Sequence, residues 1–214
     1  MPETLHTPVA FFIFKRPKTT SLVFEQIRKA RPLELFIIAD GARNQEEQKL
    51  VTETRKIAEQ VDWPCRVLTH YSETNMGCKM RISSGLDWVF SHVQKAIILE
   101  DDCLPHPSFF PFCEELLDRY EHDTRIMHIS GNFFQERNKQ FVKRTDKTGS
   151  YYGSILPHIW GWATWQRAWK TYDVNLSAWP ELRQTGKLCT VFRNSGAYAY
   201  WSRIWDEYYA GMID

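Results

Sequence analysis

Short apolar runs alternate with longer amphipathic stretches along most of the chain. The short runs are rich in β-branched and aromatic residues, which predicts strands. They span Val9–Phe14, Leu33–Ala39, Arg66–Tyr71 and Ala96–Leu99, and Ile126–Ser130 closes the regular pattern. The longer stretches carry apolar residues at helical spacing and predict helices at Thr19–Ala30, Gln45–Val61, Met80–Val93 and Phe109–Tyr120.

Strands that are separated by helical crossovers predict an α/β fold with a mixed, mainly parallel sheet flanked by helices. The length of 214 residues, of which 43% are apolar, suits one domain with a substantial core. In such sheets ligands bind beyond the carboxyl ends of the strands, so the candidate chemistry is expected just after each strand.

Composition excludes several classes of function. Lysine and arginine number 27 against 26 aspartates and glutamates, so the basic excess typical of nucleic-acid binding is missing. No apolar run approaches the roughly 20 residues that span a bilayer. Five cysteines without a C-x-x-C pair indicate reduced thiols rather than a zinc site or a redox pair. We expect a cytoplasmic protein, with peripheral association to a membrane and the oligomeric state left open.

Three consecutive carboxylates, Glu100, Asp101 and Asp102, follow directly after the strand that ends at Leu99. Like charges so close repel each other unless a cation neutralises them, and oxygen ligands suit Mg²⁺ or Mn²⁺. The alternative is a solvated acidic turn, whose negative charge favours the N-terminus of the following helix.

Other strand ends add polar groups to the same edge. Lys15 and Arg16 follow the first strand and are suited to facing a phosphate, or are simply solvated charges. Asp40 follows the second strand, where the alternative is a turn residue before Gly41. The segment 75–81 brings a glycine and two cations to a helix N-terminus, as pyrophosphate binding requires. Together these groups predict a nucleotide–metal site.

The chain resembles the GT-A-fold nucleotide-sugar glycosyltransferases, in particular the branch of N-acetylglucosaminyltransferase I and its bacterial relatives. The likeness covers most of the chain in the family's order. It is carried by PVAFFIFKRP, FIIADGARN, NMGCKMRISSGLDWVF, LEDDCLPHPSFF and HIWGWATWQRAWKTYD. The resemblance implies a GT-A-like (Rossmann-like) domain over 1–214, with a nucleotide- and metal-binding half at 1–105 and an acceptor-side half at 106–214.

The resemblance also implies roles for single residues. In its E-D-D variant of the D-x-D motif, Asp102 would bind the Mn²⁺ or Mg²⁺ that holds the donor's diphosphate. Glu100 and Asp101 would contact ribose or sugar hydroxyls. The resemblance further implies that Asp40 would contact the nucleotide base and that Arg16 would lie beside the base and the phosphates.

A looser expectation places Arg81 on the phosphate side of the donor. The general base of the family lies late, in a Trp-Asp segment, which here matches Asp206. The alternative for Asp206 is the polar face of a helix at Tyr198–Ala210. The sequence also ends in mid-element at Asp214, so we expect either truncation or an incomplete catalytic half, in which case the base lies beyond this residue.

Tryptophan is unevenly distributed, since seven of the nine follow residue 159. Indoles stack on sugar rings, which favours a carbohydrate-binding wall. The spacing of Trp162, Trp165 and Trp169 instead predicts a helix face packed into the core. Trp160 beside Gly161 is therefore the main candidate for sugar contact, with Trp201 or Trp205 as further candidates.

We expect a metal-dependent enzyme that transfers a sugar from a nucleoside-diphosphate sugar, a UDP sugar, to a glycan or other hydroxyl acceptor with inversion. One alternative is a non-catalytic module that binds a nucleotide or a glycan. A second is a nucleotidyltransferase, against which the lack of glycine in FFIFKRPKTT counts.

Overall fold

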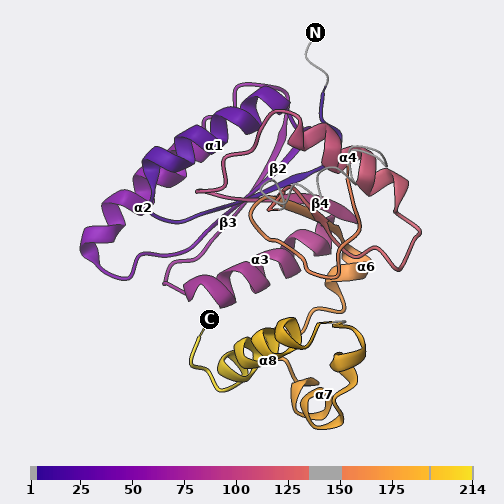
Figure 1. Ribbon diagram of the computed structural model, residues 1–214. Coiled ribbons are helices and arrows are strands. Elements are labelled where there is room, and N and C mark those ends of the chain that lie inside the picture. Colours follow the sequence, from indigo (N-terminus) through magenta and orange to yellow (C-terminus); the bar gives the residue numbers. More distant parts are fainter. Residues whose placement is uncertain (1–3, 135–150, 193, 214) are drawn as a thin grey trace.

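The computed structural model describes residues 4–134, 151–192 and 194–213, and its centre is a six-stranded sheet of order β3-β2-β1-β4-β6-β5 (Figure 1). The strands are β1 (Val9–Ile13), β2 (Glu34–Ala39), β3 (Arg66–Tyr71), β4 (Lys95–Glu100), β5 (Ile129–Ser130) and β6 (Trp162–Trp165). The first four strands are parallel, whereas β6 runs antiparallel to both of its neighbours.

Helices cover both faces of this sheet. They are α1 (Pro17–Ala30), α2 (Gln45–Ala58), α3 (Gly77–His92), α4 (Phe109–Arg119), the short α6 (Gln166–Trp169), α7 (Trp179–Thr185) and α8 (Ser195–Tyr209), with a 3-10 helix at Lys187–Thr190. One core joins the sheet to α1, α2 and α4, and the other joins it to α3. The alternation along β1 shows this directly, since Phe11 belongs to the first core and Phe12 to the second. The expected α/β fold, with a mixed, mainly parallel sheet between helices, is confirmed.

The stretch around Trp162 and Trp165 corrects the prediction of a helix. It forms β6, and residues three apart on a strand face opposite sides of the sheet. Trp162 therefore packs on the α3 side and Trp165 on the α4 side, both buried. Trp165 Nε1 donates to the carbonyl of Leu117 at 3.1 Å. These two indoles are core residues as expected, but in a strand rather than a helix.

The C-terminal helices form a small aromatic cluster of their own. The Trp179 and Trp205 rings lie 5.1 Å apart, and Trp201 lies 6.0 Å from Trp205. Figure 1 shows α7 and α8 beside α3 on the side away from α1 and α2, and Lys79 of α3 sits 4.0 Å over the Tyr208 ring. Much of the tryptophan surplus thus serves packing.

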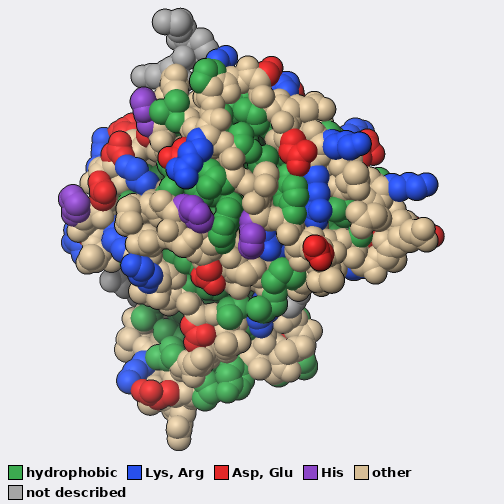
Figure 2. Space-filling view, turned by 180° about the vertical axis from the view of Figure 1, so that it is seen from behind, with side chains coloured by type: hydrophobic (Ala, Val, Ile, Leu, Met, Phe, Trp, Pro, Cys, Tyr) green, Lys and Arg blue, Asp and Glu red, His purple; other side chains and the backbone are tan. Residues whose placement is uncertain are grey.

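The surface carries charges of both signs. On the face shown in Figure 2, Lys and Arg side chains are interspersed with Asp and Glu, in keeping with the net charge of +1. Among the described residues, no helix combines the length and apolar character needed to cross a bilayer.

Candidate functional site at the carboxyl edge of the sheet

The sheet brings the predicted polar residues to one edge. In the parallel part, Phe12 of β1 pairs with Ile38 of β2 and with Glu100 of β4, so the three strands end side by side. β6 runs antiparallel to β4, so the start of β6 lies at this edge. Gly161, which directly precedes β6, therefore lies there too.

Arg16 joins two of the carboxylates after β4. The buried Asp101 accepts hydrogen bonds from the Phe14 backbone N–H and from Arg16 Nη1, both at 3.0 Å. The same nitrogen forms an ion pair with Asp102, whose side chain is 47% exposed. The structure therefore brings together Arg16, Asp101 and Asp102 as the sequence predicts, and Asp102 presents its carboxylate to solvent.

The three adjacent carboxylates carry more negative charge than the Arg16 guanidinium offsets. Burial, and then the charges of Asp102 and Asp101, raise the pKa of Glu100. Burial also raises the pKa of Asp101, against the hydrogen bond from Phe14 and the charge of Arg16. A site with these properties is suited to an added cation.

The described residues at this edge offer few metal ligands of their own, so a metal would be held largely by the phosphate groups of a bound molecule. In the described part of the chain, no three His, Cys, Asp or Glu side chains converge on one point. Mg²⁺ and Mn²⁺ commonly use one or two carboxylates together with phosphate oxygens and water. Asp102 fits that mode as a single exposed ligand, and the residues do not form an all-protein metal cage.

Asp40 has a structural task at this edge that sequence reasoning missed. Its Oδ1 accepts from the backbone of Gly41 and Met76, each at 2.9 Å. Its Oδ2 accepts from the Asn75 side chain at 2.9 Å and from the Gly77 backbone at 3.1 Å. Asp40 thus ties the start of α3 to the end of β2. A contact with a nucleotide base stays a prediction and would require exchange of one of these bonds.

The side chain of Arg81 is engaged with β3. It is buried, and its Nη2 donates to the carbonyl and to Nδ1 of His70, both at 2.8 Å. Burial lowers the pKa of Arg81. The guanidinium therefore links α3 to β3, and a contact of Arg81 with phosphate stays a prediction.

A second charged cluster was also missed, because its members lie on separate elements. Glu47, in the first turn of α2, pairs with Lys15 and with Arg43, whose Nε lies 3.0 Å from Oε1. Lys15, a predicted phosphate contact, is thus engaged by a carboxylate. Hydrogen bonds from Arg43 and then from Lys15 lower the pKa of Glu47 to about 2.

This shift makes a prediction for stability. A carboxyl whose pKa is lower in the folded state stabilises the fold above its unfolded pKa, near 4.5, and loses that effect as the pH falls toward 2. We expect the urea midpoint of the wild type to fall over this window more than that of Glu47→Gln. Equal declines in the two proteins would contradict the prediction.

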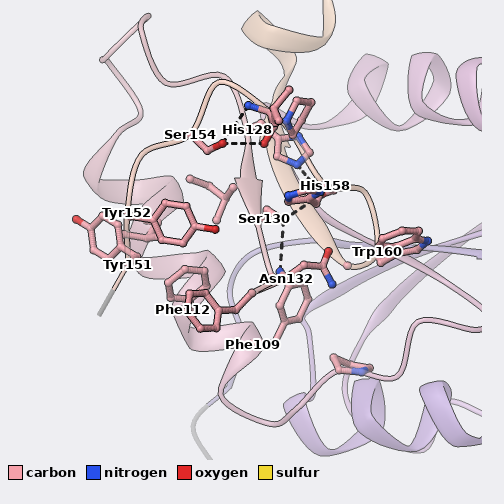
Figure 3. Close-up of a pocket in the computed structure, with 18 of the residues that line it drawn as sticks. Phe109, Phe112, His128, Ser130, Asn132, Tyr151, Tyr152, Ser154, His158 and Trp160 are labelled. Atoms are coloured by element: carbon pink, nitrogen blue, oxygen red, sulfur yellow. Dashed lines mark hydrogen bonds between the residues drawn. The ribbon is translucent and has the colours of Figure 1, made fainter. Parts of the chain in front are cut away.

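A cavity of about 1390 Å³ opens next to Asp102 (Figure 3). It lies between α4, β5 and residues 151–161, and aromatic side chains including Phe109, Phe112 and Tyr151 line it. Trp160, 58% exposed, stands on its wall. The structure thus places Trp160 and Asp102 on one cavity, and a contact of Trp160 with sugar stays a prediction.

Asp206 lies elsewhere. Its Oδ1 accepts from Trp179 Nε1 at 3.0 Å, and its Oδ2 lies 3.2 Å from Arg183. It is not among the described residues that line the cavity. In this arrangement Asp206 joins α8 to α7, and a role as general base stays a prediction.

The chain matches no protein-family model and no curated protein sequence. Solved structures do match it. One is 4-diphosphocytidyl-2C-methyl-D-erythritol synthase from Anaerococcus prevotii, with 8% identity, a TM-score of 0.42 and coverage of 75% of this chain and 72% of that one. Another is an active-site mutant of LgtC, with 12% identity, a TM-score of 0.45 and coverage of 83% and 64%. Both are enzymes, and the chain spans less than two thirds of the LgtC chain.

Proposed function

We propose that this chain is a metal-dependent glycosyltransferase. It would transfer a sugar from a UDP sugar to a hydroxyl group of a glycan or other acceptor, with inversion. The observation that supports this most is the cluster of Arg16, Asp101 and Asp102 at the carboxyl edge, opening onto the cavity that Trp160 lines. Residues 1–105 would hold the donor and residues 106–214 the acceptor.

Each polar residue at the carboxyl edge would have its own role in binding the donor. Asp102 would hold Mn²⁺ or Mg²⁺, which when bound neutralises charge on the departing diphosphate. Arg16, whose side chain is 54% exposed, would donate to phosphate oxygens and would then exchange part of its contact with Asp102. Glu100 would accept a hydrogen bond from a ribose or sugar hydroxyl. Asp101, already held by Phe14, would orient Arg16.

The rival function is a non-catalytic module that binds the nucleotide or the glycan. The engagement of Asp206 between α7 and α8 favours this rival, because an inverting transfer needs a general base at the acceptor hydroxyl. Release of UDP from a UDP sugar separates the two functions. A nucleotidyltransferase is less well supported, since no glycine lies between β1 and α1.

Titration calorimetry with UDP tests the donor site. We expect the wild type to bind UDP at least about ten-fold more tightly with Mn²⁺ than without, because Asp102 would hold the ion and the ion would neutralise charge on the diphosphate. Asp102→Asn should lose that gain. The matched control Asp62→Asn changes an exposed aspartate far along the chain and should keep it. Metal-independent binding, or none, in the wild type would refute the proposed donor site.

A further inference from the structure

The order of the strands indicates on which side of Asp102 the base of a donor would lie. The cavity beside Asp102 lies between α4, β5 and residues 151–161, on the β6 side of β4. On the other side of β4 lie β1 and β2, whose carboxyl ends share the same edge. A nucleotide sugar carries its sugar at one end of the diphosphate and its nucleoside at the other. With the sugar in the cavity and the diphosphate at Asp102, the base would lie over the ends of β1 and β2.

Asp40, at the end of β2, has little hydrogen-bonding capacity left for a base. Its Oδ1 accepts from the N–H groups of Gly41 and Met76, and its Oδ2 accepts from Asn75 and from the N–H of Gly77. The side chain is also buried. A neighbouring group with unused hydrogen-bonding capacity is therefore a better candidate for contact with the base.

Lys15 and Arg43 lie at the same end of the sheet, and Glu47 holds both of them. Lys15 lies between β1 and α1, and Arg43 lies between β2 and α2. The buried Glu47 pairs with Lys15 Nζ and accepts from the Arg43 backbone at 3.1 Å and from Arg43 Nε at 3.0 Å. Both cations also lie over the Phe14 ring, 5.5 Å and 5.8 Å from its centroid. Their positions are thus fixed by a carboxylate and by an aromatic ring.

The hydrogen-bonding capacity that this cluster leaves unused consists of donors. Arg43 Nη1 makes no hydrogen bond to the described residues, and the Arg43 side chain is 56% exposed. An ammonium group has three N–H bonds, and among the described residues Lys15 Nζ donates only to Glu47. Neither lysine nor arginine can accept a hydrogen bond. Two cations against one carboxylate also leave a surplus of positive charge. A carbonyl oxygen suits this cluster, and an amino group does not.

We propose that Lys15 and Arg43 select the base of the donor by donating hydrogen bonds to a carbonyl oxygen on its edge, and that Glu47 positions them. Uracil carries a carbonyl oxygen where cytosine carries an amino group, and that amino group would face N–H donors. The site therefore prefers uracil to cytosine. This inference rests on the proposed function, because it concerns the same donor. It assigns the choice of base to side chains other than Asp40.

A comparison of UDP with CDP tests the inference, because the two ligands share the diphosphate and the ribose. Each is titrated into the full chain in the presence of Mn²⁺. The wild type should bind UDP at least about ten-fold more tightly, as expected for one hydrogen bond from a charged donor. Arg43→Gln should reduce this preference at least about three-fold, because a glutamine amide can either donate or accept. Lys15→Met should reduce it in the same direction.

The ratio of two affinities within one variant is insensitive to the fraction of protein that is folded. The matched control Lys49→Gln removes an exposed cation on α2 and should keep the preference. Equal affinities for UDP and CDP in the wild type overturn the inference, as does a preference that survives both Arg43→Gln and Lys15→Met. In either case, tighter binding of UDP with Mn²⁺ than without leaves the donor site standing. Failure of the wild type to bind UDP refutes the donor site and this inference with it.

Discussion

Replacing Asp40 with alanine should lower the free energy of unfolding by about 3–5 kcal/mol. The buried carboxylate accepts four hydrogen bonds, three from backbone N–H groups and one from Asn75. Bonds to a charged acceptor are among the stronger ones, and their loss leaves several donors at the start of α3 unpaired. Urea unfolding measures the change.

The control for this effect is Asp62→Ala, which removes a largely exposed carboxylate and should alter stability by no more than about 0.5 kcal/mol. Asp40→Asn keeps the shape but turns an NH₂ group toward donors, so it should also destabilise. A loss for Asp40→Ala as small as that of the control would mean that water replaces the carboxylate.

Trp165→Ala should cost about 3–5 kcal/mol, the range for truncating a large buried aromatic residue. The indole is 2% exposed in the core beneath α4, and its N–H donates to Leu117. Removing it leaves both a cavity and an unpaired carbonyl. Thermal or urea unfolding would record the loss.

Trp160→Ala provides a matched comparison, since the same chemical change is made five positions earlier on an exposed side chain. We expect a change within about 0.5 kcal/mol there. Similar losses at the two positions would contradict the distinction between the buried and the exposed tryptophan.

The parallel part of the fold could be predicted because its signals are local. Each strand from β1 to β4 is a short apolar run, and each crossover helix carries its own apolar stripe. A short stretch of sequence is therefore sufficient to predict each of these elements. The carboxylate cluster followed from the same reasoning. Asp101 and Asp102 come directly after a buried strand, and Arg16 follows the neighbouring strand in the sheet.

The partners of Asp40 and Arg81 could not be predicted, because they are distant in sequence. Asp40 is satisfied by backbone groups 36 and 37 positions away, and backbone donors leave no trace in residue type. Arg81 was predicted to face phosphate because it lies close to a helix N-terminus, yet its guanidinium donates to His70 on β3. Both cases depend on contacts that the fold makes between segments far apart in the sequence.

The strand β6 was missed for a different reason. It has four residues and both of its faces are buried, so it shows no alternation of polar and apolar positions. A spacing of three and four between tryptophans then fits a helix better than a strand. The segment forms a strand because it pairs with both β4 and β5, and only the tertiary structure shows this pairing.

The direction of β6 separates residues 151–161 of the cavity wall from the carboxylates that follow β4. β5 ends and β6 begins at the same edge of the sheet. The hydrogen bond from the Gly131 N–H to the Gly161 carbonyl joins the two ends of the segment that connects these strands. Most of the described residues 151–161 of this connection line the cavity, and none of them belongs to a strand. A substitution in residues 151–161 would therefore change the cavity wall while the carboxylates that follow β4 keep their place.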